Sequence, residues 1–214
     1  VPNAEKTEVR LRGPSITPGY WRQPDKTREA FDEEGFYLMG DALKFVDPQD
    51  PGKGLIFDGR VTEDFKLSTG TWVDFAGVRA RIVKTFAPYV RDAVLTGLNR
   101  NFIGALLFTD HDAVRRIAPE LADADDAAVA AHPQVRRIFQ ERLDALGATS
   151  TGSSNFVARA IIVDSPPSLD DHEVTDKGSI NQRAVMAARA HLIEDIYAGE
   201  PGDHVLVTNR QAKA

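Results

Sequence analysis

The chain has 214 residues, of which 42% are hydrophobic, enough to build one large domain or two small ones. Its 26 lysines and arginines are interleaved with 32 aspartates and glutamates, and the net charge of -6 argues against a nucleic-acid-binding surface. Because the chain contains no cysteine, it has neither disulfides nor a thiolate nucleophile, which fits a reducing compartment, and we expect a cytoplasmic location.

The N-terminal region is predicted to be rich in short strands. Alternating residues over 7–11 are typical of a strand, and a short helix is expected over 26–31. Short apolar segments separated by glycine, aspartate and proline predict small antiparallel strands at 36–39, 42–46 and 54–57.

The region after residue 66 is predicted to mix helices with strands. The expected elements are, in order, a helix near 78–86, strands at 93–98 and 102–109, helices at 111–121 and after Pro133, a strand at 157–163 and one continuous helix at 181–197. The fold class is therefore α+β: a small antiparallel β subdomain, followed by a lobe with a three-stranded sheet flanked by helices. We place the domains at 1–61 and 62–200, with a loose tail at 201–214.

Several other kinds of site find no support in the sequence. The apolar runs are strand-length, far below the roughly 20 residues that a membrane span needs. The five histidines are scattered, so no metal site is expected, and neither a Gly-x-Ser-x-Gly elbow nor a Walker-type phosphate loop occurs. The charged run 170–173 is predicted to be a solvated face.

Two corners that contain glycine carry candidate ligand-binding residues. Asp41 follows Gly40 at the end of an apolar segment, and its carboxylate can accept two hydrogen bonds from adjacent hydroxyls, such as a ribose diol. The alternative is an ordinary turn aspartate. Arg60 follows Gly59 in the second corner, where a guanidinium suits a phosphate or forms only a surface ion pair.

Five segments of the chain, in this order, resemble motifs of the adenylate-forming acyl-CoA synthetases, most closely the feruloyl-CoA synthetase-like branch. They are GPSITPGYW (13–21), YLMGD (37–41), DGRVTEDFKLSTGTWV (58–73), DAV (92–94) and TDKGSINQ (175–182). The resemblance implies an enzyme that activates a small carboxylic acid, aromatic or of medium length, with ATP to an acyl-adenylate and then transfers the acyl group to coenzyme A. It also implies that a small C-terminal lobe rotates between the two half-reactions.

The resemblance assigns roles to residues of the first two corners. It makes Asp41, together with Tyr37 and Arg60, the nucleotide-binding group. It places the hinge between the two lobes at Thr62, where many members of the family carry aspartate or lysine instead.

The resemblance likewise implies a channel for coenzyme A along the segment 66–72. Lys66, Gly70 and Trp72 are its expected lining, since glycine permits close approach of the backbone and tryptophan offers a flat apolar face. For Trp72, a place in the hydrophobic core is an equally good interpretation.

The lysine expected to act in adenylation is Lys177. Members of the family carry this lysine in a loop near the C-terminus, commonly directly after a glycine, whereas here Ser179 follows Gly178 and Lys177 precedes it. Lys177 is the only lysine between Lys84 and Lys213, so we assign the role to it, with a plain surface charge as the alternative and Arg183 as a second candidate.

The family's phosphate-binding loop, acid pocket and magnesium ligands precede the region that is matched here. The missing N-terminal lobe is therefore an expected partner, and we expect the chain alone to be inactive. Two alternatives remain open: a non-catalytic module of the same fold for nucleotide, coenzyme A or protein binding, and an adenylating domain that loads a carrier protein. No nucleic acid or membrane partner is expected, and a homodimer is left open.

Overall fold

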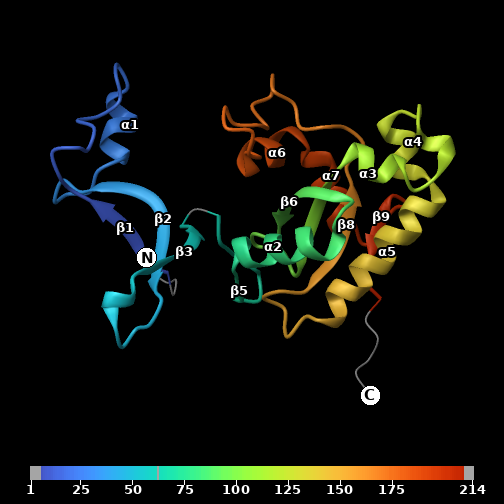
Figure 1. Cartoon of the computed structure of the whole chain (residues 1–214), viewed down its shortest axis with the longest axis horizontal. Helices are drawn as coiled ribbons and strands as arrows, with labels where there is room; N and C mark the ends of the chain where they lie inside the picture. Colours follow the sequence, from blue (N-terminus) through green and yellow to red (C-terminus); the bar gives the residue numbers. More distant parts are fainter. Residues whose placement is uncertain (1–5, 62, 210–214) are drawn as a thin grey trace. The chain divides into compact units, whose positions relative to one another are not determined.

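The computed structural model describes residues 6–61 and 63–209 and divides the chain into two compact units, Val1–Asp64 and Phe65–Ala214 (Figure 1). The division lies three residues after the boundary at 61 that the sequence predicts. Each unit is described by itself below.

The first unit is built on a three-stranded antiparallel sheet in the order β1-β2-β3. Its elements are β1 (Glu8–Leu11), α1 (Pro24–Glu29), β2 (Tyr37–Phe45), the 3-10 helix η1 (Pro51–Lys53) and β3 (Leu55–Arg60). A bulge interrupts the pairing of β2 with β3 between Asp41 and Leu43. A bulge changes the direction of the side chains next to it, and this bulge begins at Asp41, the first candidate ligand-binding residue.

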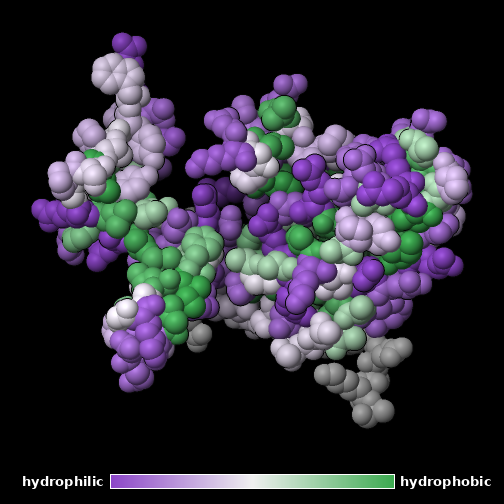
Figure 2. All heavy atoms as spheres, in the orientation of Figure 1, coloured by the Kyte–Doolittle hydropathy of each residue, from purple (hydrophilic) through white to green (hydrophobic). Residues whose placement is uncertain are grey.

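The first unit has a very small hydrophobic core. Among its described residues, Ala42 is the one buried hydrophobic side chain, whereas Leu55, Ile56 and Phe57 of β3 are each exposed by at least 45%. Figure 2 shows the resulting apolar surface around β2 and β3. Strand pairing, together with ion pairs such as Lys44–Asp58 at 2.7 Å, holds the sheet in place of a packed interior.

The second unit contains a four-stranded sheet in the order β6-β7-β8-β9. The strands are β6 (Val90–Thr96), β7 (Ile103–Thr109), β8 (Val157–Ile162) and β9 (Val205–Val207), and β7 pairs parallel to β8 while the other pairs are antiparallel. A separate small hairpin, β4 (Phe65–Lys66) with β5 (Trp72–Val73), precedes them. The helices are α2 (Phe75–Phe86), α3 (His111–Arg115), η2 (Pro119–Leu121), α4 (Asp126–Ala131), α5 (Pro133–Ala148), α6 (Gln182–Ala188) and α7 (Ala190–Tyr197).

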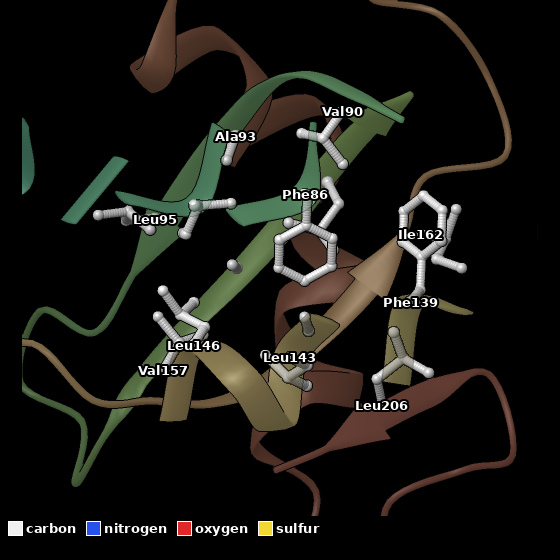
Figure 3. Close-up of a cluster of buried hydrophobic side chains, with 14 of the residues drawn as sticks. Phe86, Val90, Ala93, Leu95, Phe139, Leu143, Leu146, Val157, Ile162 and Leu206 are labelled. Atoms are coloured by element: carbon white, nitrogen blue, oxygen red, sulfur yellow. The ribbon is translucent and has the colours of Figure 1, made fainter. Parts of the chain in front are cut away.

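The two faces of this sheet belong to two different hydrophobic clusters, because successive side chains of a strand point to opposite sides. Leu95 of β6 joins the cluster made with α2 and α5, which Figure 3 shows, and its neighbour Val94 joins the cluster made with α6 and α7. The β4–β5 hairpin contributes Phe65 and Leu67 to the first cluster. Ile180, by contrast, packs against the second.

The structure confirms the predicted α+β class and corrects several details of the second unit, among them the helix predicted at 111–121, which is divided into α3 and η2. The sheet has a fourth strand, β9, so the predicted loose tail at 201–214 is wrong for 205–207, which pair with β8. A strand of three residues is too short to reveal itself by alternation. The predicted continuous helix over 181–197 is instead two helices, divided at Arg189, whose backbone has φ -109° and ψ 32°.

Across the described residues, none of the helices combines the length and the apolar character that crossing a membrane requires.

Candidate functional site

Asp41 and Arg60 lie directly opposite each other on β2 and β3. Their Cα atoms are register partners, and the Arg60 Nε lies 3.6 Å from the Asp41 Oδ1. The side chain of Asp41 is 28% exposed and that of Arg60 is 64% exposed, so both can reach a ligand. A carboxylate that accepts hydrogen bonds thus stands beside a guanidinium that donates them, as a ribose next to a phosphate would need.

Each member of this pair follows a glycine in the left-handed region. Gly40 has φ 75° and Gly59 has φ 83°, values that residues with a Cβ rarely adopt. The Gly40 N–H donates to the Glu8 Oε1 at 3.1 Å, and the Gly40 carbonyl accepts from the Val61 N–H at 2.8 Å. The backbone around the pair is therefore held on both sides by hydrogen bonds.

Tyr37 lies at the beginning of β2, opposite Leu11 of β1 and away from the register position that joins Asp41 to Arg60. Its hydroxyl is 3.1 Å from that of Tyr20, and this hydrogen bond, with burial, raises the pKa of Tyr37. The fourth candidate of this region, the hinge residue Thr62, lies outside the described residues.

Lys66, Gly70 and Trp72 are brought together in the β4–β5 hairpin. Lys66 pairs with Trp72 across the strands, and its Nζ lies 5.6 Å from the centroid of the Trp72 ring, within range of a cation–π interaction. Gly70, with φ 86°, shapes the connecting loop. Trp72 is 38% exposed while its neighbour Val73 is buried, so its ring is available at the surface instead of filling the core.

This hairpin is attached to the turn between β6 and β7. The Asn99 N–H donates to the Lys66 carbonyl at 3.0 Å, and the Ser68 N–H donates to the Arg100 carbonyl at 2.9 Å. The Ser68 hydroxyl donates to the Asn101 Oδ1 at 2.6 Å. The candidate channel residues are therefore fixed to the sheet of the second unit.

Lys177 stands at the tip of a second hairpin. Val174 and Ile180 form a bridge, the Thr175 N–H donates to the Ser179 carbonyl at 2.8 Å, and Gly178 has φ 78°. Three-residue loops that end in a left-handed glycine are a common hairpin type. Lys177 is exposed and, within the described ranges, has no hydrogen-bond or ion-pair partner.

The residues on the two sides of Gly178 have different surroundings. The Ser179 hydroxyl lies 2.7 Å from the Thr175 hydroxyl at the neck of the hairpin, so the residue directly after the glycine is tied to the opposite strand. The ammonium group is presented one residue before the glycine, by Lys177. Arg183, the second candidate, lies outside this turn in the first part of α6.

Glu173, at the base of the same hairpin, is buried, so the prediction that the run 170–173 is a solvated face is wrong for this residue. Its side chain is 1% exposed and accepts two hydrogen bonds of 2.7 Å from the Arg189 guanidinium. These bonds lower the pKa of Glu173 below its ordinary value, against the opposing effect of burial. The acidic run therefore ends in a buried ion pair.

One feature of the sequence indicates the ion pair of Glu173 with Arg189. Val185, Arg189 and Ile193 follow one another at intervals of four, so Arg189 occupies a position on the inward stripe of the predicted helix. A charged residue at such a position needs a buried partner. The spacing alone does not tell which carboxylate provides it.

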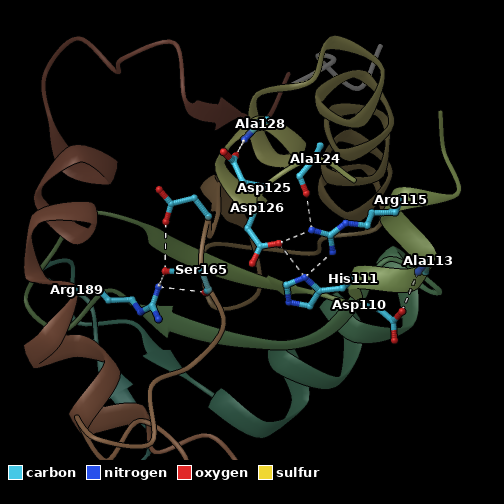
Figure 4. A network of polar contacts seen from close by, with 11 residues as sticks. Asp110, His111, Ala113, Arg115, Ala124, Asp125, Asp126, Ala128, Ser165 and Arg189 are labelled. Atoms are coloured by element: carbon cyan, nitrogen blue, oxygen red, sulfur yellow. Dashed lines mark hydrogen bonds and ion pairs between the residues drawn. The ribbon is translucent and has the colours of Figure 1, made fainter. Parts of the chain in front are cut away.

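A further polar network links α3 to α4, as Figure 4 shows. The Arg115 Nη2 donates to the Asp126 Oδ1 at 2.9 Å and to the Ala124 carbonyl at 2.8 Å, and the His111 Nδ1 is 3.0 Å from the same Asp126 oxygen. These contacts are satisfied within the network and tie the two helices together. In the part of the chain that the structure describes, no group of three or more histidines, aspartates and glutamates is placed to hold a metal ion.

The sequence is similar to a known protein family and to several ligases. A family model described as AMP-binding enzyme C-terminal domain matches residues 64–201. A chloroplastic long-chain-fatty-acid–acyl-carrier-protein ligase of Arabidopsis thaliana is 23% identical over 209 residues, which cover 92% of this chain and 26% of that protein. A putative fatty-acid–CoA ligase of Mycobacterium tuberculosis is 28% identical over 198 residues, which cover 92% of this chain and 34% of that protein. The chain thus spans about a quarter to a third of the length of these relatives.

Solved structures show the same likeness. The adenylation domain of a carboxylic acid reductase from Segniliparus rugosus, in complex with AMP and a co-purified carboxylic acid, is 25% identical with a TM-score of 0.65. This match covers 90% of this chain and 28% of that chain. The A-PCP didomain of a carboxylic acid reductase from the same organism, in complex with AMP, is 24% identical with a TM-score of 0.63, and the match covers 90% of this chain and 25% of that one. This second likeness is one of fold alone.

Proposed function

Since the chain belongs to the AMP-binding enzyme C-terminal domain family, we propose that it is the C-terminal part of an ATP-dependent acyl-activating ligase. In this proposal residues 1–61 are the end of the adenylation lobe and 62–200 are the mobile C-terminal lobe. The full-length protein is then a polypeptide in which this chain follows the remainder of an adenylation lobe. The observation that carries the proposal is the exposed Lys177, which has no partner among the described residues and lies on a hydrogen-bonded hairpin inside the matched region.

The proposed reaction has two steps. A carboxylate oxygen of the acid attacks the α-phosphorus of ATP, the bond to pyrophosphate breaks, and an acyl-adenylate forms. A thiol sulfur then attacks the acyl carbon, AMP leaves, and the thiol proton is lost. Asp41 would accept hydrogen bonds from the ribose hydroxyls, Arg60 would lie toward the phosphate, and the Lys177 ammonium would stabilise the negative charge that develops in the first step. Magnesium would be held by residues outside this chain, as the family resemblance implies.

The acyl acceptor that we favour is coenzyme A. The exposed Trp72 ring and the Lys66 ammonium beside it suit a channel for an extended thiol arm with a charged end. Loading of a carrier protein is the second candidate, because the relatives include an acyl-carrier-protein ligase by name. Both acceptors offer a thiol, so the first half-reaction is common to them.

The acid that we favour is aromatic or of medium length, on the resemblance to feruloyl-CoA synthetase-like enzymes. The relatives are named for fatty acids, and long-chain acids therefore belong in the same test. The full-length protein is expected to catalyse acid-dependent exchange of labelled pyrophosphate into ATP with at least one acid of such a panel. Failure with every acid would contradict the ligase proposal. Release of AMP with coenzyme A or with a thiol-bearing carrier protein then identifies the acceptor.

The 214-residue chain alone is expected to show neither exchange nor thioester formation, since the groups that would hold pyrophosphate and the acid are absent from it. The measurement is the same exchange assay, with the full-length protein as positive control. Acyl-adenylate or acyl-CoA formed by the purified chain would contradict this prediction.

Replacing Asp41 with alanine in the full-length protein is expected to raise the KM for ATP by about 10- to 100-fold, since a hydrogen bond to a charged group contributes about 1.5–3 kcal/mol. Asp58→Ala is the matched control: it removes another carboxylate of the same hairpin, one bound to Lys44 at 2.7 Å. Its effect on the KM should stay below about threefold, because a surface ion pair contributes little. Equal KM changes in the two variants would remove Asp41 from the nucleotide site.

A further inference from the structure

The hairpin that carries Lys177 has little packing of its own. All five residues from Thr175 to Ser179 are exposed, and only Val174 and Ile180 at its base are half-buried. Ile180 packs against the cluster formed with α6 and α7. The direction in which Lys177 points therefore depends on how the base of the hairpin is held.

Glu173 holds that base through its backbone as well as its side chain. Its carbonyl accepts from the Asn181 N–H at 2.8 Å, and its N–H donates to the Ser168 carbonyl at 2.9 Å. The carboxylate accepts from the Ser168 N–H at 2.7 Å in addition to its two bonds with Arg189. Glu173 therefore holds both strands of the hairpin at its base: it begins one strand and accepts a hydrogen bond from Asn181 at the end of the other.

Arg189 connects this residue to the remainder of the unit. Its Nη1 donates to the Ser165 hydroxyl at 2.8 Å, a contact visible in Figure 4, and its Nη2 donates to the Pro166 carbonyl at 2.9 Å. Its guanidinium carbon lies 5.2 Å from the centroid of the Phe108 ring on β7. Arg189 also stands at the break between α6 and α7. One guanidinium therefore joins the segment after β8, strand β7, the helix break and the hairpin.

Stability alone is a poor reason to bury such a pair. Removing two charges from water is costly, and well-packed apolar residues of similar volume often stabilise a fold equally well. A two-pronged guanidinium–carboxylate pair does, however, fix the relative orientation of the groups it joins. The exposed hairpin at 175–179 has little packing to fix its own orientation, and the ion pair can fix it.

We propose that Glu173 and Arg189 are positioning residues for adenylation: their buried ion pair sets the direction in which the Lys177 hairpin presents its ammonium group. The inference rests on the proposed function of Lys177. It assigns the pair to the first half-reaction only, because the candidate channel at Lys66 and Trp72 is attached elsewhere, to the turn between β6 and β7.

The test is Arg189→Lys, which keeps the charge and loses the two-pronged geometry. In the full-length protein, kcat for acid-dependent pyrophosphate exchange should fall about 10- to 100-fold, as misplacement of a reacting group predicts, while KM for ATP and transfer from supplied acyl-adenylate change less than about threefold. In the 214-residue chain, the amides of Gly178 and Asn181, which donate to Thr175 and Glu173, should exchange with solvent faster.

Arg159→Lys is the matched control. The Arg159 Nη1 donates to the Ile196 and Ala198 carbonyls at 2.8 and 2.6 Å, and its guanidinium lies 5.2 Å from the Phe102 ring, so it resembles Arg189 in surroundings without touching the hairpin. The Arg159→Lys variant should leave the rates of both half-reactions nearly unchanged, and likewise the solvent exchange of the hairpin amides. If Arg189→Lys does not fold, Ser165→Ala removes one acceptor of the guanidinium and should produce the same pattern, with kcat for pyrophosphate exchange lowered about tenfold.

The outcomes separate the positioning inference from the function on which it rests. If Arg189→Lys leaves the amide exchange of the hairpin unchanged, the positioning role is overturned. It is also overturned if Arg189→Lys speeds amide exchange but leaves adenylation at its full rate, while Lys177→Ala abolishes adenylation. Equal loss in both half-reactions also overturns it, because a general weakening of the lobe would act on both. If Lys177→Ala itself leaves adenylation intact, the assignment of Lys177 fails, and the positioning role fails with it.

Discussion

Replacing Lys177 with alanine is expected to slow acyl-adenylate formation by the full-length protein about 10²- to 10³-fold, the usual effect of removing one group that stabilises charge in a transition state. The exposed ammonium lies at a hairpin tip and has no partner among the described residues, so its loss should leave the fold intact. Transfer of the acyl group from supplied acyl-adenylate should change less than about threefold, because that step does not create the same charge. Pyrophosphate exchange measures the first step and thioester formation the second.

Arg183→Ala is the control for this prediction. Arg183 is a second exposed cation close by in sequence, in the first part of α6, and it should be replaceable with little effect on either step. A large loss in Arg183→Ala with a normal Lys177→Ala would transfer the role to Arg183. Equal loss of both half-reactions in Lys177→Ala would point to a structural effect instead.

Replacing Phe139 with alanine is expected to destabilise the second unit by about 3–5 kcal/mol, the cost of deleting a large buried side chain. Phe139 is fully buried on α5, and its ring centroid lies 5.6 Å from that of Phe86 and 6.3 Å from that of Tyr89. Figure 3 shows Phe86 and Phe139 in this cluster. Urea unfolding of the 214-residue chain, followed by far-ultraviolet circular dichroism, measures the change.

Leu169→Ala is the matched control, since Leu169 is 73% exposed in the same unit. Its effect should remain within about 0.5 kcal/mol. A loss below about 1 kcal/mol in Phe139→Ala would mean that the cluster collapses around the gap, contrary to a rigid, close-packed interior.

The longer regular elements of the second unit were predictable because their patterns extend over many residues. Helix α5 repeats buried residues at helical spacing over several turns, and β7 is a continuous apolar run between turn signals. Strand β9 escaped prediction because three residues carry no period. The division at Arg189 escaped as well, since the helical pattern of apolar residues continues across it.

The candidate site was predictable in part. The family resemblance placed Asp41 and Arg60 in one group before their strands were known to pair, and the structure brings them 3.6 Å apart. The buried role of Glu173 could not be predicted, because three charged neighbours in sequence indicate a solvated face. Only the fold shows that the chain turns inward at that residue.

The two hairpins of the second unit belong to opposite faces of its sheet: Phe65 and Leu67, around Lys66, pack into the cluster on one face, and Ile180, behind Lys177, packs against the cluster on the other. The first is bound by hydrogen bonds to the turn between β6 and β7, and the second is held at its base by Ser168 and Arg189. If both hairpins serve one nucleotide site, as we propose, their places on opposite faces favour their use in turn. A single rotation of the unit would then exchange Lys177 for Lys66 and Trp72 at that site.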